Sequence, residues 1–447
     1  MRTLLTSCPV VALSALLALA AADMVPGCAR GAAPAATDSS VPAAPFRAPY
    51  IPAGDGENLQ DVPSTADPAV ATMRQLRAQW TAAPHSLPAA LALAGAYTDY
   101  SRQIGDAHYA GYAEAVIAPW LAAAHPPPGV LVAEATILQY RHQFNDARAL
   151  LQRALAIDAG NAQAWLTLAT LDMVQGDYAA AGKDCRQVTS SAGFAYGLAC
   201  TGNLFAYVGK ARQSLALLQQ AQAALGGAPA TVTAWLEGLL AESAERLGDG
   251  PLAETHYRNA LKLLPEDNFL LVAYADFLLD RGRPQEVLPL LAEHTQSDTA
   301  FLRLALARAA LKTADAPRYA WIMAARFEAL KLRGSDYFGR EQVRFALHLE
   351  HDPQSALDLA QRNWQLQRAP WDARVLLEAA LAAEQPQAAR EVLQFVHETH
   401  LEDPAIAPLV QALRVRLNRL VTIRPDRLRP GLEHDPVADG QPPGARP

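Results

Sequence analysis

A pattern that returns about every 34 residues constrains this chain more than any other feature of its sequence. The clearest copy spans residues 164–188 and reads AWLTLATLDMVQGDYAAAGKDCRQV. Trp165 and Ala169 fall on one helical face, Gly176 interrupts the helix, and Ala181 is small enough to let a second helix pack closely against the first. Because one such pair of helices cannot bury its apolar face alone, successive pairs are expected to stack.

Further copies keep the same register, with turns predicted at Gly105, Gly209 and Gly282 and a closing proline at Pro265. This combination resembles the tetratricopeptide repeat family, and the leader described below indicates an exported bacterial type. The family pattern places a large residue, a leucine and a small residue on the first helix, and small residues and a closing proline on the second. The resemblance implies an all-α fold, a right-handed α-solenoid of stacked antiparallel helix pairs.

The resemblance is strongest over residues 131–294 and weaker elsewhere. Beyond Ala300, helix pairs are still predicted, with Pro317, Pro353 and Pro386 near their turns. We expect about eight pairs within a repeat domain at 68–420, since terminal repeats are commonly atypical. An Arg/Pro-rich disordered tail is predicted at 421–447.

The composition agrees with a helical chain that does not bind nucleic acid. Hydrophobic residues make up 51% of the sequence, and alanine and leucine, which favour helices, dominate them. The formal net charge is −7, with no basic region extensive enough to hold nucleic acid phosphates. No cofactor is predicted.

The first 28 residues have the pattern of a signal peptide, with Arg2 followed by an apolar run that is too short to span a membrane. Two cleavage sites fit: after the small residues Ala20 and Ala22, or before Cys28 in a lipoprotein-like box. The second would tether the protein to the outer membrane through a lipid on Cys28, which is the one membrane attachment we expect. Residues 29–67 are predicted to be an Ala/Pro-rich linker. The expected location is the periplasm.

Two sets of residues leave alternatives open. Cys185 and Cys200 form either a disulfide or two buried thiols. Two histidine pairs with a spacing of three would place both imidazoles on one helical face, a geometry suited to zinc, although no further ligand completes either site. These weak metal candidates are His348, His351, His397 and His400.

No catalytic residue is predicted. The sequence GDYAAAGK at 176–183 differs from a phosphate-binding loop in its spacing and lacks the following Ser or Thr, and no G-x-S-x-G or H-E-x-x-H motif occurs. The chain is therefore expected not to be an enzyme. Arg414, Arg416 and Arg419 begin an arginine cluster that suits anionic lipid or an acidic partner, or is a solvated end.

The family resemblance places the first helix of each pair along a concave groove, where a protein or peptide would bind. We therefore expect a scaffold or adaptor in the cell envelope. The alternatives are a metal-handling or enzyme-accessory protein and a self-associating structural unit. Carried onto matching positions, the groove candidates are Asp99, Arg102, Thr136, Gln139, Tyr140, Thr170, Met173, Asn203, Tyr207, Glu242, Arg246, Asp276 and Asp280.

Overall fold

The computed structural model describes residues 68–332 and 339–423. The predicted leader, linker, Cys28 and the end of the tail lie outside these residues. Within them the chain is helical and contains no strand, as predicted. No helix in these two ranges has both the length and the apolar character needed to cross a bilayer.

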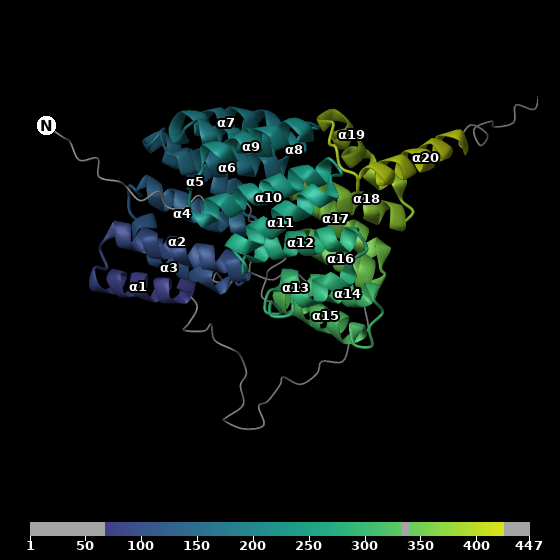
Figure 1. Ribbon diagram of the computed structural model, residues 1–447, viewed down its shortest axis with the longest axis horizontal. Helices are drawn as coiled ribbons and strands as arrows, with labels where there is room; N and C mark the ends of the chain where they lie inside the picture. Colours follow the sequence, from purple (N-terminus) through teal and green to yellow (C-terminus); the bar gives the residue numbers. More distant parts are fainter. Residues whose placement is uncertain (1–67, 333–338, 424–447) are drawn as a thin grey trace, which may run out of the picture.

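The twenty α-helices and two short helical turns follow one another along the chain (Figure 1). They are α1 (Pro68–Ala82), α2 (Leu87–Ile104), α3 (His108–Leu121), α4 (Pro128–Tyr140), α5 (Phe144–Ile157), α6 (Ala162–Gln175), α7 (Tyr178–Ala192), α8 (Phe194–Tyr207), α9 (Ala211–Ala224), α10 (Ala230–Arg246), α11 (Gly250–Leu263), α12 (Asn268–Asp280), α13 (Pro284–Leu290), α14 (Asp298–Ala310), α15 (Ala316–Leu332), α16 (Gly339–Phe345), η1 (Ala346–Glu350), α17 (Pro353–Leu366), α18 (Pro370–Ala382), η2 (Pro386–Ala389), α19 (Arg390–Thr399) and α20 (Ala407–Ile423).

The helices pack as consecutive pairs, from α2 with α3 to α18 with α19. The described residues thus hold nine pairs, one more than expected, with α1 before them and α20 after them. The turns lie where the sequence predicts them. Gly105 and Gly176 end α2 and α6 in the left-handed conformation, which glycine adopts without strain. Helix α20 runs to Ile423, past the predicted domain boundary at 420.

Small residues hold the pairs together. Ala181 is fully buried and packs in a core cluster with Ala169 of α6, as its place in the repeat requires. The same cluster contains Cys185 of α7 and Cys200 of α8, which a disulfide joins with their Cα atoms 5.4 Å apart. The bond therefore links the second helix of one pair to the first helix of the next.

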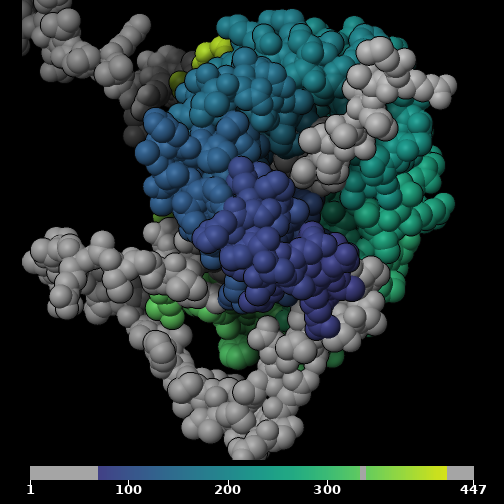
Figure 2. Space-filling view, turned by 90° about the vertical axis from the view of Figure 1, so that its left-hand side faces the viewer, coloured from purple at the N-terminus to yellow at the C-terminus, as the bar shows by residue number. Residues whose placement is uncertain are grey.

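The array curves far enough for late pairs to lie against early ones. In Figure 1 the chain rises from α1 at lower left over α7–α9 at the top and descends through α12–α15, and Figure 2 shows the early helices from the side. Helix α2 packs against α12. At the Gly105 turn, an added methyl group would lie only 2.6 Å from Oγ of Ser297.

The same closure continues along the chain. The backbone N–H of Arg368 donates to the carbonyl of Val174 at 2.7 Å, and the Tyr178 hydroxyl donates to the carbonyl of Arg368. At the next turn, Gly209 lies directly against the carbonyl of His400. We call this line of contacts between the turns of α6–α9 and residues 368–400 the seam. Because of the seam, the inner face is enclosed by the chain itself.

Candidate functional site

The enclosed inner face differs from the open groove expected from the sequence. Eight of the thirteen candidates are buried, at no more than 8% exposure. These eight are Gln139, Tyr140, Thr170, Met173, Asn203, Tyr207, Arg246 and Asp276. The partly exposed ones are Asp99, Arg102, Thr136 and Glu242, and Asp280 is exposed.

Two of the candidates are packing residues. Met173 is 1% exposed and lies in the core between α6 and α7, and the Thr170 hydroxyl donates to the carbonyl of Leu166 one turn earlier. Both side chains are buried, so in this structure they do not lie on an open surface. Tyr207, Glu242, Arg246, Asp276 and Asp280, in contrast, gather around one hollow.

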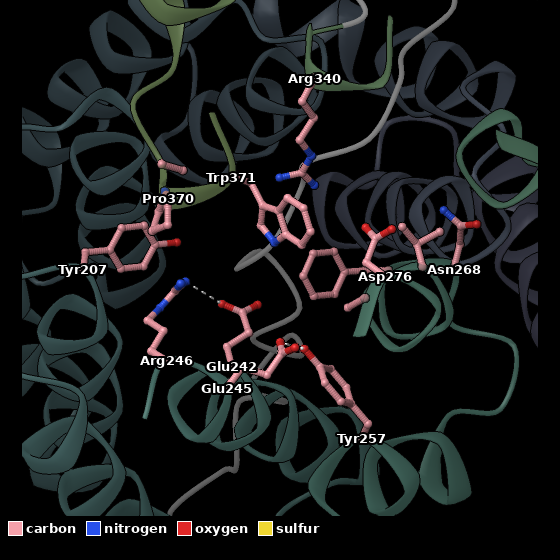
Figure 3. A pocket seen from close by; sticks show the side chains of 14 residues that line it. Tyr207, Glu242, Glu245, Arg246, Tyr257, Asn268, Asp276, Arg340, Pro370 and Trp371 are labelled. Atoms are coloured by element: carbon pink, nitrogen blue, oxygen red, sulfur yellow. Dashed lines mark hydrogen bonds and ion pairs between the residues drawn. The ribbon is translucent and has the colours of Figure 1, made fainter. Parts of the chain in front are cut away.

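This hollow, which we call the central cleft, has a narrow inner part of about 40 Å³, drawn in Figure 3, and a wider part of about 360 Å³. Both parts are lined by Glu242, Glu245 and Arg246 of α10 and by Pro370 and Trp371 of α18. Helix α10 belongs to the fifth pair and α18 to the ninth. The cleft therefore exists because the array closes on itself.

One wall carries a chain of charges. Arg246 lies 3.5 Å from Glu242, one turn earlier on α10, and 3.4 Å from Asp403 in the loop before α20. Its guanidinium also stands 5.4 Å from the ring centre of Tyr207. Burial raises the pKa of Glu242, although Arg246 opposes the shift. Arg246 thus links α10 to the loop before α20.

Glu245 lies beside them and is held in a less polar setting. Its carboxylate accepts a hydrogen bond of 2.7 Å from the hydroxyl of Tyr257, and Arg281 stands 3.8 Å away. Burial raises the pKa of Glu245 to about 8. At neutral pH this carboxyl is thus mostly protonated and can donate a hydrogen bond as well as accept one.

Trp371 forms the opposite wall, and three guanidinium groups surround its ring. Arg374, Arg344 and Arg340 stand 4.6, 5.5 and 6.0 Å from its centre. Figure 3 shows Trp371 in the middle of the hollow, with Arg340 above it. Arg374 also pairs with Asp280 of α12 at 2.7 Å, which fastens α18 across the cleft. An aromatic ring among arginines offers a surface for stacking and for carboxylate recognition.

Asp276 lies at the inner end of the cleft and has a structural role. It accepts hydrogen bonds from Arg303 at 2.8 Å and from Arg344 at 2.6 Å. Burial alone would raise the pKa of Asp276, but the two guanidinium groups hold it well below its usual range. Because Arg303 also contacts Glu341, this network ties α12 and α14 to α16.

The histidine pairs differ from their expected geometry. His351 and His400 each follow the end of a helical segment in the left-handed conformation, with φ of 57° and 55°, so neither shares a helical face with its partner. The rings of His397 and His400 are 6.4 Å apart. Within 68–332 and 339–423, no group of three or more His, Cys, Asp or Glu side chains is arranged to hold a metal ion.

The residues that line the cleft include groups able to bind a polar ligand. They supply carboxylates, guanidinium groups, aromatic rings and an amide, and no Ser, Thr, Cys, His or Lys is among those described. Trp371, Arg374, Glu245 and Asp403 were not among the sequence candidates. The Trp371-x-x-Arg374 spacing on a helix was visible in the sequence, but its opposition to α10 depends on the closure of the whole array.

Comparison with known proteins agrees with the repeat assignment. Residues 139–188 match the family model described as tetratricopeptide repeat, a stretch from the end of α4 into α7. No curated protein matches the sequence.

Several solved structures are similar to the chain. They include the APC/C hetero-tetramer Cut9-Hcn1, with 13% identity, a TM-score of 0.37, and coverage of 77% of this chain and 52% of that one. Yeast Tom70 has 11% identity, a TM-score of 0.39, and coverage of 80% and 86%. A tetratricopeptide repeat protein from Parabacteroides merdae has 12% identity, a TM-score of 0.35, and coverage of 59% and 97%. This chain thus spans about half the length of the first.

The match at 139–188 and the helix pairs built around Gly176 and Ala181 together support a protein of the tetratricopeptide repeat type.

Proposed function

We propose that this protein is a non-catalytic scaffold of the cell envelope that binds a protein or peptide segment in the central cleft. The observation that carries the proposal is the meeting of α10 and α18 around Trp371, with carboxylates and guanidinium groups on both sides. A half-buried aromatic anchor with polar groups around it suits recognition of an extended segment. Because the wider part holds about 360 Å³, it would take one or two side chains rather than a whole helix.

The location in the envelope rests on two features. The first 28 residues have the signal pattern described above, with Cys28 as the candidate for lipidation. The disulfide between Cys185 and Cys200 suits an oxidising compartment, where such bonds persist. Globomycin treatment of the expressing cells tests the lipid anchor. Accumulation of an uncleaved precursor would support it, and normal maturation would contradict it.

The binding role is tested by replacing Trp371 with alanine. Partners captured from envelope fractions by the native chain are identified by mass spectrometry, and the affinity of the purified partner is then measured by calorimetry. We expect Trp371→Ala to weaken binding about tenfold or more, since it removes the aromatic anchor.

Trp321→Ala is the matched control, because Trp321 lies on α15 at 57% exposure and away from the cleft. It should leave the affinity unchanged. Equal affinity of the native chain and a folded Trp371→Ala variant for every captured partner would reject the cleft as the binding site. Thermal unfolding of both variants establishes that they are folded.

A further inference from the structure

The last helix is packed on one side and open on the other. Helix α20 packs against α18 and η2, and its Leu413 is fully buried there. It therefore occupies the position of a first helix in a tenth pair. Among the residues that the structure describes, no second helix follows it.

A groove runs along the open side of α20. It holds about 520 Å³ between α19 and α20, and we call it the terminal groove. Its floor is apolar, formed in part by Val396, Leu401 and Ile406. Val415 also lines the groove and is 45% exposed, one of the large apolar side chains left uncovered. Earlier first helices pack directly on the preceding second helix, as α8 does on α7 and α18 on α17.

The lining residues of α20 form a continuous stripe. They recur at spacings of three and four, which is one face of a helix. The stripe consists of Ala407, Val410, Gln411, Arg414, Val415 and Asn418. It is roughly 16 Å long, at 1.5 Å rise per residue. A groove of this length and shape suits a partner helix of about three turns.

Charge indicates the character of that helix. Arg414 lines the groove, and α20 contains no acidic residue. Asp403 is the acidic residue in the lining, and its carboxylate already faces Arg246 at 3.4 Å. The imidazoles of His397 and His400 add hydrogen-bonding groups at the rim. An acidic helix would find complementary charge here, whereas a basic one would meet Arg414.

We propose that the terminal groove binds an amphipathic helix of a partner protein, with an apolar stripe against Val415 and acidic residues toward Arg414. The sequence after Ile423 is a poor source of this helix. Residues 424–447 contain six prolines and no proline-free stretch longer than five residues. A helix of three turns needs about eleven, and proline disrupts a helix interior. The terminal groove shares Asp403 with the lining of the central cleft but does not include Trp371.

The test uses two labelled synthetic peptides of about 14 residues, each with leucines on one helical face. One carries glutamates on its other face, and the second carries lysines at the same positions. Fluorescence anisotropy with the full chain should show saturable binding of the acidic peptide, with Kd below about 1 mM, and at least about tenfold weaker binding of the basic one.

Variants on α20 locate the site. Val415→Asp and Arg414→Glu should each weaken binding of the acidic peptide about tenfold. Arg416→Glu is the matched control, because it makes the same charge change on the same helix but lies outside the groove and faces the carbonyl of Leu381. It should change the affinity less than about twofold. Trp371→Ala should also leave it unchanged, which separates this proposal from the proposed function.

Four results would overturn the proposal. These are no saturable binding of the acidic peptide, equal binding of both peptides, an equal loss in Arg416→Glu, and binding that develops only after residues 424–447 are removed. The last result would assign the groove to the tail of the chain. Sedimentation of the chain without peptide tests whether a second copy of the chain occupies the groove. A dimer that is lost in Val415→Asp would assign the groove to self-association and contradict binding of a partner helix.

Discussion

Single side chains in the central cleft are held in unusual protonation states by their surroundings, and Glu245 is the clearest case. Its pKa is about 8 in the fold, against an ordinary value near 4.5. A carboxyl whose pKa is raised on folding binds more protons in the folded than in the unfolded state between these values. Stability is therefore lost as the pH rises from about 4.5 through about 8. We expect Glu245→Gln to flatten this loss by about 1 to 2 kcal/mol between pH 6 and 8.5.

Urea unfolding at several pH values measures the difference. Glu242, Arg246 and Asp280 act on the same carboxyl, so the comparison must be between the native chain and the single variant. Glu293→Gln is a suitable control, since Glu293 is exposed, follows α13 and does not line the cleft. Parallel pH profiles of the native chain and Glu245→Gln would contradict the raised pKa.

At the scale of helices, the pair between α6 and α7 depends on a small residue at the crossing. Ala181 has no exposed surface and is enclosed by the apolar cluster of these helices. Replacing it with tryptophan would overpack the crossing and should destabilise the chain by about 1 to 3 kcal/mol. Ala179→Trp, on the exposed side of the same helix, should change stability by less than about 0.5 kcal/mol. Equal melting temperatures of the two variants would reject the register of this repeat.

Local rules account for most of the helices and their ends. Glycine at turns such as Gly176 and proline at a helix start such as Pro284 act within a few residues, so the sequence alone predicts them. The geometry of the histidine pairs could not be predicted in this way. His351 and His400 occupy left-handed positions normally favoured by glycine, and nothing in their type or spacing indicates that the helix ends before them.

At the scale of the whole molecule, closure of the array determines which distant residues contact one another. The sequence does not predict this closure. Each pair is rotated slightly against the next, and the rotations add over the four steps from the fifth pair to the ninth before α18 reaches α10. A small error per pair would leave Trp371 far from Glu242. The sequence therefore predicts that residues of the first helices lie at the inner face. It does not predict their partners from the C-terminal pairs or the burial of Tyr207 and Asp276.

The seam that closes the array can be tested at one glycine. Gly209 has φ of 64°, and a methyl group there would overlap the carbonyl oxygen of His400. Gly227 has φ of 84°, and nothing lies within 4 Å of a methyl group added there. Alanine at either position is strained by backbone conformation, but only Gly209→Ala also clashes. We expect Gly209→Ala to cost about 1 to 3 kcal/mol more than Gly227→Ala. It should also speed hydrogen exchange at Leu401, whose N–H donates to the carbonyl of Val396. If the two variants unfold at the same urea concentration, the turn between α8 and α9 does not contact the end of α19 in solution. The closed array would then be one of several arrangements of the same pairs.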